Sequence, residues 1–412
     1  MKGCDCGTPS DRLLPVDEAI AELLQRAPAP PAVESVGLEQ ALGRVLAEPI
    51  VAPFDLPRWD NSAMDGYALR QADLPQGGVL PLAGRVAAGD GAEQRLPAGH
   101  AMRIFTGAPL PQGADSVIAQ EVCEALGDSV RLPASEPGSH VRRRGEELRR
   151  GEPVLAAGQR LRPQDLGLLA SLGLARVPVH RRLRVGLLSS GDELREPGQV
   201  LAPGQIYNAN RYSIGALLRG LGLEVHDYEV LADELAASRD ALSLAASEWD
   251  LLITSGGVSV GEEDHLKSAI RELGSLHLWR LAMQPGKPLA FGEVGGKPWI
   301  GLPGNPAAAL VTALVVARPF LLRAQGVAEV AVRPLRLVAG FDWMRANPRR
   351  QYLRARIEPA ADGSSRVLIH PRQGSAMLLA ASWAEGLALV EAGRTFEAGA
   401  AVDFLPFAAL LH

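Results

Sequence analysis

Three segments with glycine turns, two of them also rich in serine, could bind an anionic ligand. They read "LLSSGDELREPG" (187–198), "ITSGGVSVGEEDH" (253–265) and "IGLPGNPAAAL" (300–310). Glycine lets the main chain approach a bulky ligand, and serine or threonine hydroxyls donate hydrogen bonds to anionic oxygens. In the third segment a turn runs straight into a helix, whose first N–H groups are free to bind phosphate. The residues expected to contact such a ligand are Ser255, Gly256, Gly257, Ser259, Pro303, Gly304, Asn305 and Pro306.

Carboxylates in the same segments indicate a divalent cation. An acid beside a phosphate repels it unless a cation lies between them, so Asp192, Glu193 and Asp264 could hold Mg²⁺ through oxygen. Each feature has an ordinary explanation, because Ser-Gly-Asp is common in turns and Asp264 could cap a helix. Lys287, on the Pro-Gly turn of "MQPGKPLAFG", could add a positive charge or could be an ordinary surface lysine.

The elements that must position these segments alternate between strand and helix from residue 182 to about 325. This alternation predicts a doubly wound, mostly parallel sheet with helices on both faces. Ligands bind such sheets at the carboxyl ends of the strands, which would bring the three segments together. Neither G-x-x-x-x-G-K-[ST] nor G-x-G-x-x-G occurs in them, which disfavours both common nucleotide-binding folds.

The rest of the chain predicts further domains. Short apolar pieces between Pro and Gly turns indicate a β-rich domain at 51–140, and a similar texture after residue 330 indicates a small antiparallel sheet or barrel. Apolar spacing predicts a helix over 13–26, and a second short helix is expected over 36–49. The predicted fold class is therefore α/β plus β in a multidomain chain.

Composition excludes several classes of protein. The 412 residues carry a net charge of −5, which is not typical of a general nucleic-acid binder. Three cysteines argue against a disulfide framework, and Cys4 and Cys6 in "KGCDCG" are more typical of a frayed terminus than of a metal site. The apolar run 307–317 is too short to span a bilayer, and no signal peptide is evident, so a cytoplasmic protein is predicted.

Nine segments, in order along residues 13–405, together resemble the molybdopterin molybdenumtransferases, the family of bacterial MoeA and the gephyrin E domain. The segments are "PRWDNSAMDGYA", "RIFTGAPLPQGAD", "VRRRGEE", "LLSSGDEL", "GQIYNANRY", "ITSGGVSVGEEDH", "PGKPLAFG", "GLPGNPAAA" and "RQGSA".

The resemblance implies an elongated homodimer of four-domain chains. Residues 10–50 and 141–180 would form a discontinuous linking domain, 51–140 a β-rich insert, 181–330 the α/β domain and 331–412 the C-terminal β domain. The active cleft would lie between the insert of one subunit and the α/β and C-terminal domains of the other. Possible further partners are a molybdopterin adenylyltransferase and apo-molybdoenzymes.

The resemblance also implies a reaction and its residues. Adenylylated molybdopterin would be cleaved with Mg²⁺, AMP would leave, and molybdate would enter the dithiolene to give molybdenum cofactor. Glu193 and Asp264 would hold the metal, and Arg354 of "RRQYLR" is expected to bind molybdate. The other positions carried over by resemblance are Asp65, Thr106, Arg142, Asp233, Lys287 and Ser375.

Three positions depart from the family pattern, namely Glu147, Gln284 and Ala308. Gln284 replaces a common lysine, and losing a cation beside a dianion could cost about 1.5–3 kcal/mol. Arg280 or the arginine run at 142–150 could compensate, or the protein could prefer tungstate. Two alternative functions stay open at this point, a non-catalytic docking scaffold and adenylyl transfer from ATP to molybdopterin.

Overall fold

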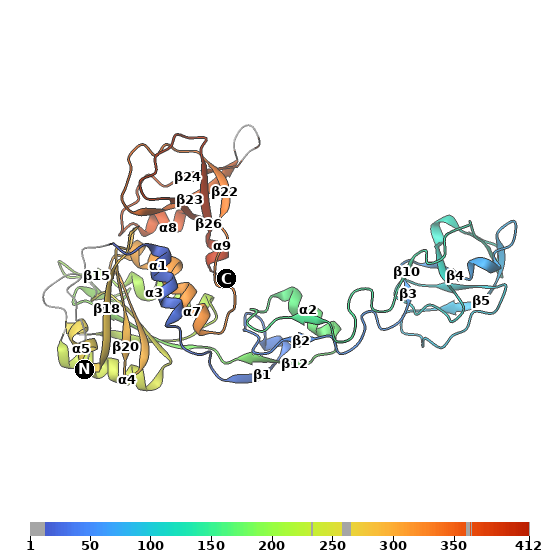
Figure 1. Cartoon of the computed structure of the whole chain (residues 1–412), viewed down its shortest axis with the longest axis horizontal. Helices are drawn as coiled ribbons and strands as arrows, with labels where there is room; N and C mark the ends of the chain where they lie inside the picture. The colour runs from blue at the N-terminus through green and yellow to red at the C-terminus, as the bar shows by residue number, and fades with distance from the viewer. Residues whose placement is uncertain (1–12, 232–233, 258–264, 360–362, 364, 412) are drawn as a thin grey trace. The chain divides into compact units, whose positions relative to one another are not determined.

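The computed structural model describes residues 13–231, 234–257, 265–359, 363 and 365–411. It divides into two compact units. The α/β unit comprises residues 1–47, 158–162 and 177–412, and the β-rich unit comprises 48–157 and 163–176. Both are drawn in Figure 1, and each is described here by itself. The four-domain division stays a prediction.

A six-stranded sheet forms the centre of the α/β unit. Four neighbouring strands are parallel, the fifth runs antiparallel to them, and the sixth is antiparallel to the fifth. The fourth and fifth strands form a hairpin whose turn contains Gly295 and Gly296. The prediction of a mostly parallel sheet is therefore confirmed. In order across the sheet the strands are β16 (Glu224–Leu231), β13 (Arg184–Ser190), β17 (Leu251–Ser255), β21 (Lys297–Leu302), β20 (Pro288–Val294) and β18 (Gly274–Arg280).

Both faces of this sheet are covered by helices, because successive side chains of a strand point to opposite faces. Leu251 and Ile253 pack into one core and Leu252 into the other. The first core includes residues of α1 (Val16–Gln25), α3 (Ala209–Gly220), α6 (Pro306–Thr312) and α7 (Arg318–Ala324). The second includes residues of α4 (Leu235–Glu248) and α5 (His265–Leu273) (Figure 1).

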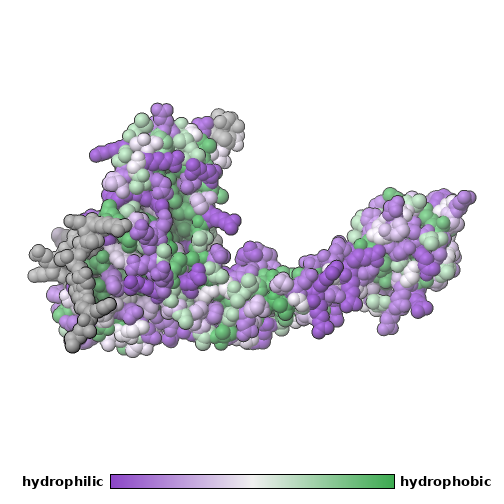
Figure 2. Space-filling view, viewed as in Figure 1, coloured by the Kyte–Doolittle hydropathy of each residue, from purple (hydrophilic) through white to green (hydrophobic). Residues whose placement is uncertain are grey.

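The most apolar helix of the chain is continuous over Pro306–Ala324, with a π-helical turn at Ala313–Ala317 between α6 and α7. By length and composition alone it could cross a membrane, but 89% of its most apolar window is buried inside the protein. It packs against α1 and α3. This helix is therefore buried as a core helix is. On the face shown in Figure 2, hydrophilic and apolar residues are interspersed over the described surface of both units.

The C-terminal part of the α/β unit is a closed barrel. Its strands pair in the order β23–β24–β22–β26–β25, and β25 pairs back to β23. The predicted barrel is confirmed, although β22 and β24 are parallel. The two-residue strand β19 (Met283–Gln284) pairs with the start of β23 and so joins the barrel to the α/β sheet. The elements are β22 (Leu335–Ala339), β23 (Arg350–Pro359), β24 (Ser365–Ile369), α8 (Leu378–Trp383), β25 (Gly386–Val390), β26 (Ala401–Pro406) and α9 (Phe407–Leu410).

The β-rich unit contains a six-stranded sheet, which agrees with the β-rich structure predicted for this part of the chain. Its strands, in order across the sheet, are β7 (Ser116–Ala119), β4 (Gly66–Leu69), β6 (Ala101–Ile104), β5 (Val79–Val86), β9 (Ser129–Arg131) and β8 (Glu124–Ala125). Two short ladders and a helix complete the unit. They are β2 (Ile50–Val51) with β11 (Pro153–Leu155), β3 (Asn61–Ser62) with β10 (Val141–Arg142), and α2 (Pro163–Ser171).

The predicted helix over 36–49 is wrong. Strand β1 (Val33–Gly37) pairs with β12 (Arg176–His180), and a single 3₁₀ turn, Leu38–Gln40, follows it. Val45 and Leu46 then form isolated bridges to Arg160 and Val179. Gly43 has a φ of +70°, which interrupts a right-handed helix, and the returning segment satisfies the main chain by pairing instead. A tertiary pairing partner thus overrode the local apolar spacing.

Asp250, the residue directly before β17, forms hydrogen bonds whose contribution to the stability of the sheet can be tested. It accepts hydrogen bonds from Arg181 Nη1 at 2.8 Å, from the main-chain N–H of Arg184 at 2.9 Å and from Arg184 Nη2 at 3.2 Å. Burial by itself would raise the pKa of Asp250, but these hydrogen bonds outweigh it and lower the pKa to about 2.

Asp250→Asn is expected to lower the free energy of unfolding by about 1 kcal/mol at pH 7, allowing for solvent screening. The folded pKa lies below the unfolded value of about 3.9, so this contribution is present above pH 4 and is lost as the pH falls toward 2. Urea unfolding of both proteins at pH 7 and pH 3 measures it. An equal difference at both pH values would contradict the ionic explanation.

Candidate active site

The strand register brings the three predicted segments to one edge of the sheet. Ser255 at the end of β17 lies opposite Ser189 on β13 and opposite Leu302 on β21. A cavity of about 880 Å³ opens there. Its wall on the sheet side is formed by Ser190, Gly191, Glu193, Ser255, Gly256, Gly257, Pro303, Gly304, Asn305 and Pro306. Most of the residues predicted to contact an anionic ligand therefore share one cavity.

Glycine is required where these loops meet. Gly256 has a φ of +90°, and a Cβ at this position would lie 2.4 Å from the carbonyl oxygen of Ser190. A Cβ on Gly304 would lie 3.8 Å from the Cα of Gly256. The main chains of three loops therefore approach within contact distance, beside the hydroxyl of Ser255.

The segment "GQIYNANRY" forms another side of the cavity, although sequence reasoning did not name its residues as site residues. Strand β14 (Leu194–Arg195) pairs with β15 (Ile206–Tyr207), and α3 begins just after them. Asn208 caps this helix by accepting a hydrogen bond from the main-chain N–H of Arg211 at 3.2 Å. Asn210 Nδ2 donates to Ser255 Oγ at 2.6 Å and to the carbonyl of Gly304 at 2.8 Å. All four of Ile206, Tyr207, Asn208 and Asn210 line the cavity.

The opposite wall carries the positive charge. It is formed by the turn at 284–288, by Arg349 and by the loop at 373–376 of the barrel, so Lys287 and Ser375 line the same cavity as the sheet-edge loops. Arg349 Nη2 donates to Gln284 Oε1 at 2.8 Å. The main-chain N–H of Ala308 in α6 donates to the carbonyl of Ser375 at 3.0 Å, which joins this wall to the sheet side.

Arg354, the arginine expected to bind molybdate, is fully buried and is not among the residues that line the cavity. Its Nη2 donates to the carbonyl of Gly374 at 3.1 Å, and its main-chain N–H donates to Gln373 Oε1 at 3.0 Å. Burial lowers the pKa of Arg354 to about 10. Arg354 thus supports the barrel loop from behind, and Arg349 is the arginine of "RRQYLR" that faces the cavity.

Glu193 is the carboxylate that the described structure places in the cavity wall. Among the described residues there is no group of three or more His, Cys, Asp or Glu that could hold a metal ion. Magnesium is commonly held by one or two carboxylates together with substrate phosphates and water, so Glu193 beside a phosphate cradle fits it. Asp233, Ser259 and Asp264 lie outside the described residues.

Asp65, Thr106 and Arg142 belong to the β-rich unit. Thr106 donates to Asp65 Oδ1 through its main-chain N–H at 2.7 Å and through its hydroxyl at 2.8 Å. The main-chain bond first, and the hydroxyl second, lower the pKa of Asp65. Arg142 is exposed on β10. The structure brings Asp65 and Thr106 together, and their part in a cleft with the α/β unit stays a prediction.

Part of the arginine run at 142–150 is explained by local ion pairs. Arg143 Nη1 contacts Asp60 at 2.7 Å, and Arg144 Nε contacts Asp55 at 2.6 Å. The main-chain N–H groups of Arg144 and Arg150 donate to the same two carboxylates. These bonds fix the loop that leads into and out of the β-rich sheet.

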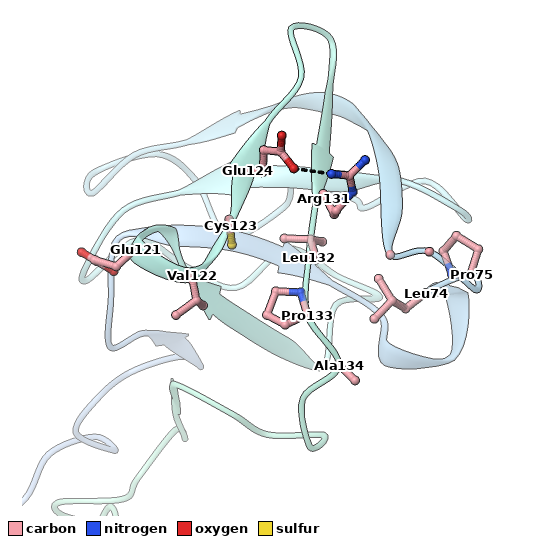
Figure 3. Close-up of a pocket in the computed structure, with 12 residues that line it drawn as sticks. Leu74, Pro75, Glu121, Val122, Cys123, Glu124, Arg131, Leu132, Pro133 and Ala134 are labelled. Carbon is pink, nitrogen blue, oxygen red and sulfur yellow. Dashed lines mark hydrogen bonds and ion pairs between the residues drawn. The ribbon is translucent and has the colours of Figure 1, made fainter.

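A second hollow, of about 570 Å³, lies in the β-rich unit (Figure 3). Leu74, Val122, Leu132 and Pro133 line it together with Cys123 and the ion pair Glu124–Arg131. The Cys123 thiol donates to the carbonyl of Ala119 at 3.1 Å, and burial raises its pKa, so it is a poor nucleophile. None of the residues predicted for the site lines this hollow, and the chemistry points to the cavity at the sheet edge.

Comparisons with known proteins show which family this chain belongs to. Three family models match the chain: "MoeA N-terminal region (domain I and II)" over residues 14–173, "Probable molybdopterin binding domain" over 186–323, and "MoeA C-terminal region (domain IV)" over 336–407. A molybdopterin molybdenumtransferase of Haemophilus influenzae is 44% identical over 76% of this chain and 78% of its own length. One from Staphylococcus aureus is 33% identical over 95% of both chains.

Solved structures of this family have the same fold. A crystal structure of a molybdopterin biosynthesis MoeA protein from Pyrococcus horikoshii is 28% identical, covers 96% of this chain and all of its own, and has a TM-score of 0.80. The fold is therefore that of a multidomain protein whose α/β part matches the family model of a probable molybdopterin-binding domain. The chain belongs to the MoeA family of molybdopterin molybdenumtransferases.

Gly256→Ala is expected to destabilise the protein well beyond the cost of a left-handed conformation, which is about 1–2 kcal/mol. The reason is the contact of the new Cβ with the carbonyl of Ser190. Gly296→Ala is the matched control, since its φ is +75° but nothing lies within 4 Å of its Cβ. Thermal melts of both variants measure the difference. Equal melting temperatures would contradict the close approach of the loops.

Proposed function

We propose that this protein is a molybdopterin molybdenumtransferase that cleaves adenylylated molybdopterin, releases AMP and inserts molybdate to give molybdenum cofactor. The observation that supports this most directly is the composition of the cavity, which combines two kinds of anion-binding wall. The glycine-rich loops and the serines Ser190 and Ser255 line the sheet side, and Lys287, Arg349 and Ser375 line the barrel side. A substrate with a phosphoanhydride and a separate oxyanion requires both.

On the sheet side, the residues act by holding the phosphates in one geometry. The loops after β13, β17 and β21 and the Ser255 hydroxyl would supply hydrogen-bond donors to the phosphates, and fixed donors of this kind stabilise developing negative charge. Glu193 would hold Mg²⁺ against a phosphate oxygen. Magnesium, when bound, would neutralise phosphate charge and polarise the phosphorus–oxygen bond that breaks. Asp264 is the second metal-binding residue that we propose.

On the barrel side, Lys287 and Arg349 would attract molybdate, a dianion that needs cationic and hydroxyl donors. Gln284 accepts a hydrogen bond from Arg349, so the residue that replaces a common lysine of the family orients a different cation. Ser375 adds a hydroxyl on the same wall. The cavity thereby retains two positive charges for the oxyanion without the lysine.

The homodimer implied by the resemblance is part of the proposal, because Asp65, Thr106 and Arg142 belong to the unit that does not line this cavity. In a dimer, the β-rich unit of a second copy could supply them. Light scattering measures the mass in solution, and a fully active monomer near 43.6 kDa would contradict the shared cleft. The cytoplasmic location and the protein partners stay predictions.

AMP release tests the reaction. Purified protein given adenylylated molybdopterin, Mg²⁺ and molybdate is expected to release AMP, and Lys287→Ala to lower the rate about 10- to 100-fold through loss of a charge-assisted hydrogen bond. Glu193→Gln keeps the shape of the side chain and should shift the Mg²⁺ requirement to higher concentration. A wild-type protein that binds this substrate but releases no AMP would contradict the proposed reaction and favour a docking role.

Arg349→Ala and Arg354→Ala separate the two arginines of "RRQYLR". Removing Arg349 should raise the molybdate concentration needed for half-maximal activity about tenfold or more and leave the melting temperature nearly unchanged, because this side chain is at the cavity wall. Removing Arg354 should instead lower the melting temperature, because it leaves the Gly374 carbonyl without its partner. The opposite pattern would restore Arg354 as the molybdate-binding residue.

A further inference from the structure

We propose that Asn210 is a positioning residue for the substrate phosphates and that it acts by orienting the hydroxyl of Ser255. The inference rests on the proposed function, since it assigns a role within the same cavity. Asn210 belongs to the segment "GQIYNANRY", which lines the cavity but has no role in the proposed function of either wall. Asn210 is the second residue of α3 and is only 9% exposed.

The side-chain amide of Asn210 links two loops that are separated by nearly fifty residues. Its Nδ2 donates to Ser255 Oγ, at the end of β17, at 2.6 Å. The same nitrogen donates to the carbonyl of Gly304, on the loop after β21, at 2.8 Å. An amide nitrogen has two protons, so one is available for each acceptor.

The chemistry of the acceptors fixes which end of the amide faces the loops. The carbonyl of Gly304 can only accept, so an amide oxygen placed 2.8 Å from it would be repelled. The nitrogen must therefore face both loops. The amide oxygen is left on the other side, buried and without a hydrogen-bond partner among the described residues. Such a group usually costs stability, which suggests that the orientation serves the site.

This orientation determines what Ser255 can do. A hydroxyl has one proton, and because Ser255 Oγ already accepts from Asn210, its own proton is free for a further acceptor. Ser255 is 3% exposed and lines the cavity, so a phosphate oxygen of the substrate is the acceptor that fits. Asn210 would thus turn Ser255 from a rotating hydroxyl into a fixed donor, which is what preorganised binding of a charge requires.

A purely structural role for Asn210 is the alternative, and two variants separate it from positioning. Asn210→Ala removes the amide. Asn210→Asp keeps its shape but places an oxygen toward Gly304 and can accept the Ser255 proton, which would turn that proton away from the cavity. A residue that only fills space tolerates the isosteric aspartate, whereas a positioning donor does not.

The experiment measures binding of AMP in the presence of Mg²⁺ by calorimetry, with melting temperatures as the check on folding. We expect Asn210→Ala and Ser255→Ala each to weaken AMP binding about tenfold. The double variant should be no weaker than either single one, because both remove the same donor. Asn210→Asp should bind AMP at least as weakly as Asn210→Ala. Ser213→Ala is the matched control, since its hydroxyl bonds only to the main-chain carbonyl of Asn210, at 3.4 Å, and it should bind AMP as the wild type does.

The outcomes separate the two proposals. If the wild type binds AMP and Asn210→Asp binds equally well, the positioning role is overturned and the proposed function stands. If the losses of Asn210→Ala and Ser255→Ala multiply in the double variant, Asn210 does not act through Ser255. If Asn210→Ala does not fold, Asn210→Asp and Ser255→Ala decide the question. A wild-type protein that does not bind AMP overturns the proposed function and this inference with it.

Discussion

The close approach of three main-chain loops at the edge of one parallel sheet is the constraint on which the rest of the site depends. Parallel pairing of β13, β17 and β21 brings the ends of these strands into line. Contact between the loops is possible only because Gly256 has no Cβ to meet the carbonyl of Ser190. Once the loops touch, their residues line a common cavity together with Ser255.

The barrel adds residues from a distant part of the sequence to this cavity, among them Arg349. Pairing of β19 with β23 holds the turn that carries Lys287 next to the segment that carries Arg349. The bond from Ala308 to the carbonyl of Ser375 then fixes the barrel loop against the start of α6. The cavity thereby combines loops rich in glycine with a wall that carries Lys287 and Arg349, which is the arrangement behind the proposed substrate with two separate anionic groups.

Gln284 illustrates how a departure from a family pattern is understood only in context. The sequence predicts a lost cation there, with compensation from Arg280 or from the arginine run. In the structure Gln284 accepts from Arg349, and Asn347 Nδ2 donates to the same oxygen at 3.3 Å. A lysine at 284 would repel Arg349 instead. The substitution therefore changes which cation is held in the wall, not only how many there are.

The sequence by itself determined the fold class and the mostly parallel sheet, because apolar periodicity and Gly-Pro punctuation are local properties of the chain. The family followed from the resemblance of nine segments, and the C-terminal part was left open between an antiparallel sheet and a barrel. It also identified Ser255, Glu193 and Lys287, since their residue types name their chemistry. Only the tertiary structure decided that 36–49 pairs as extended chain, that Arg349 and not Arg354 faces the cavity, and that Asn210 bridges two loops. The physical reason is that burial and pairing depend on neighbours distant in sequence, and two arginines five residues apart differ only in what surrounds them.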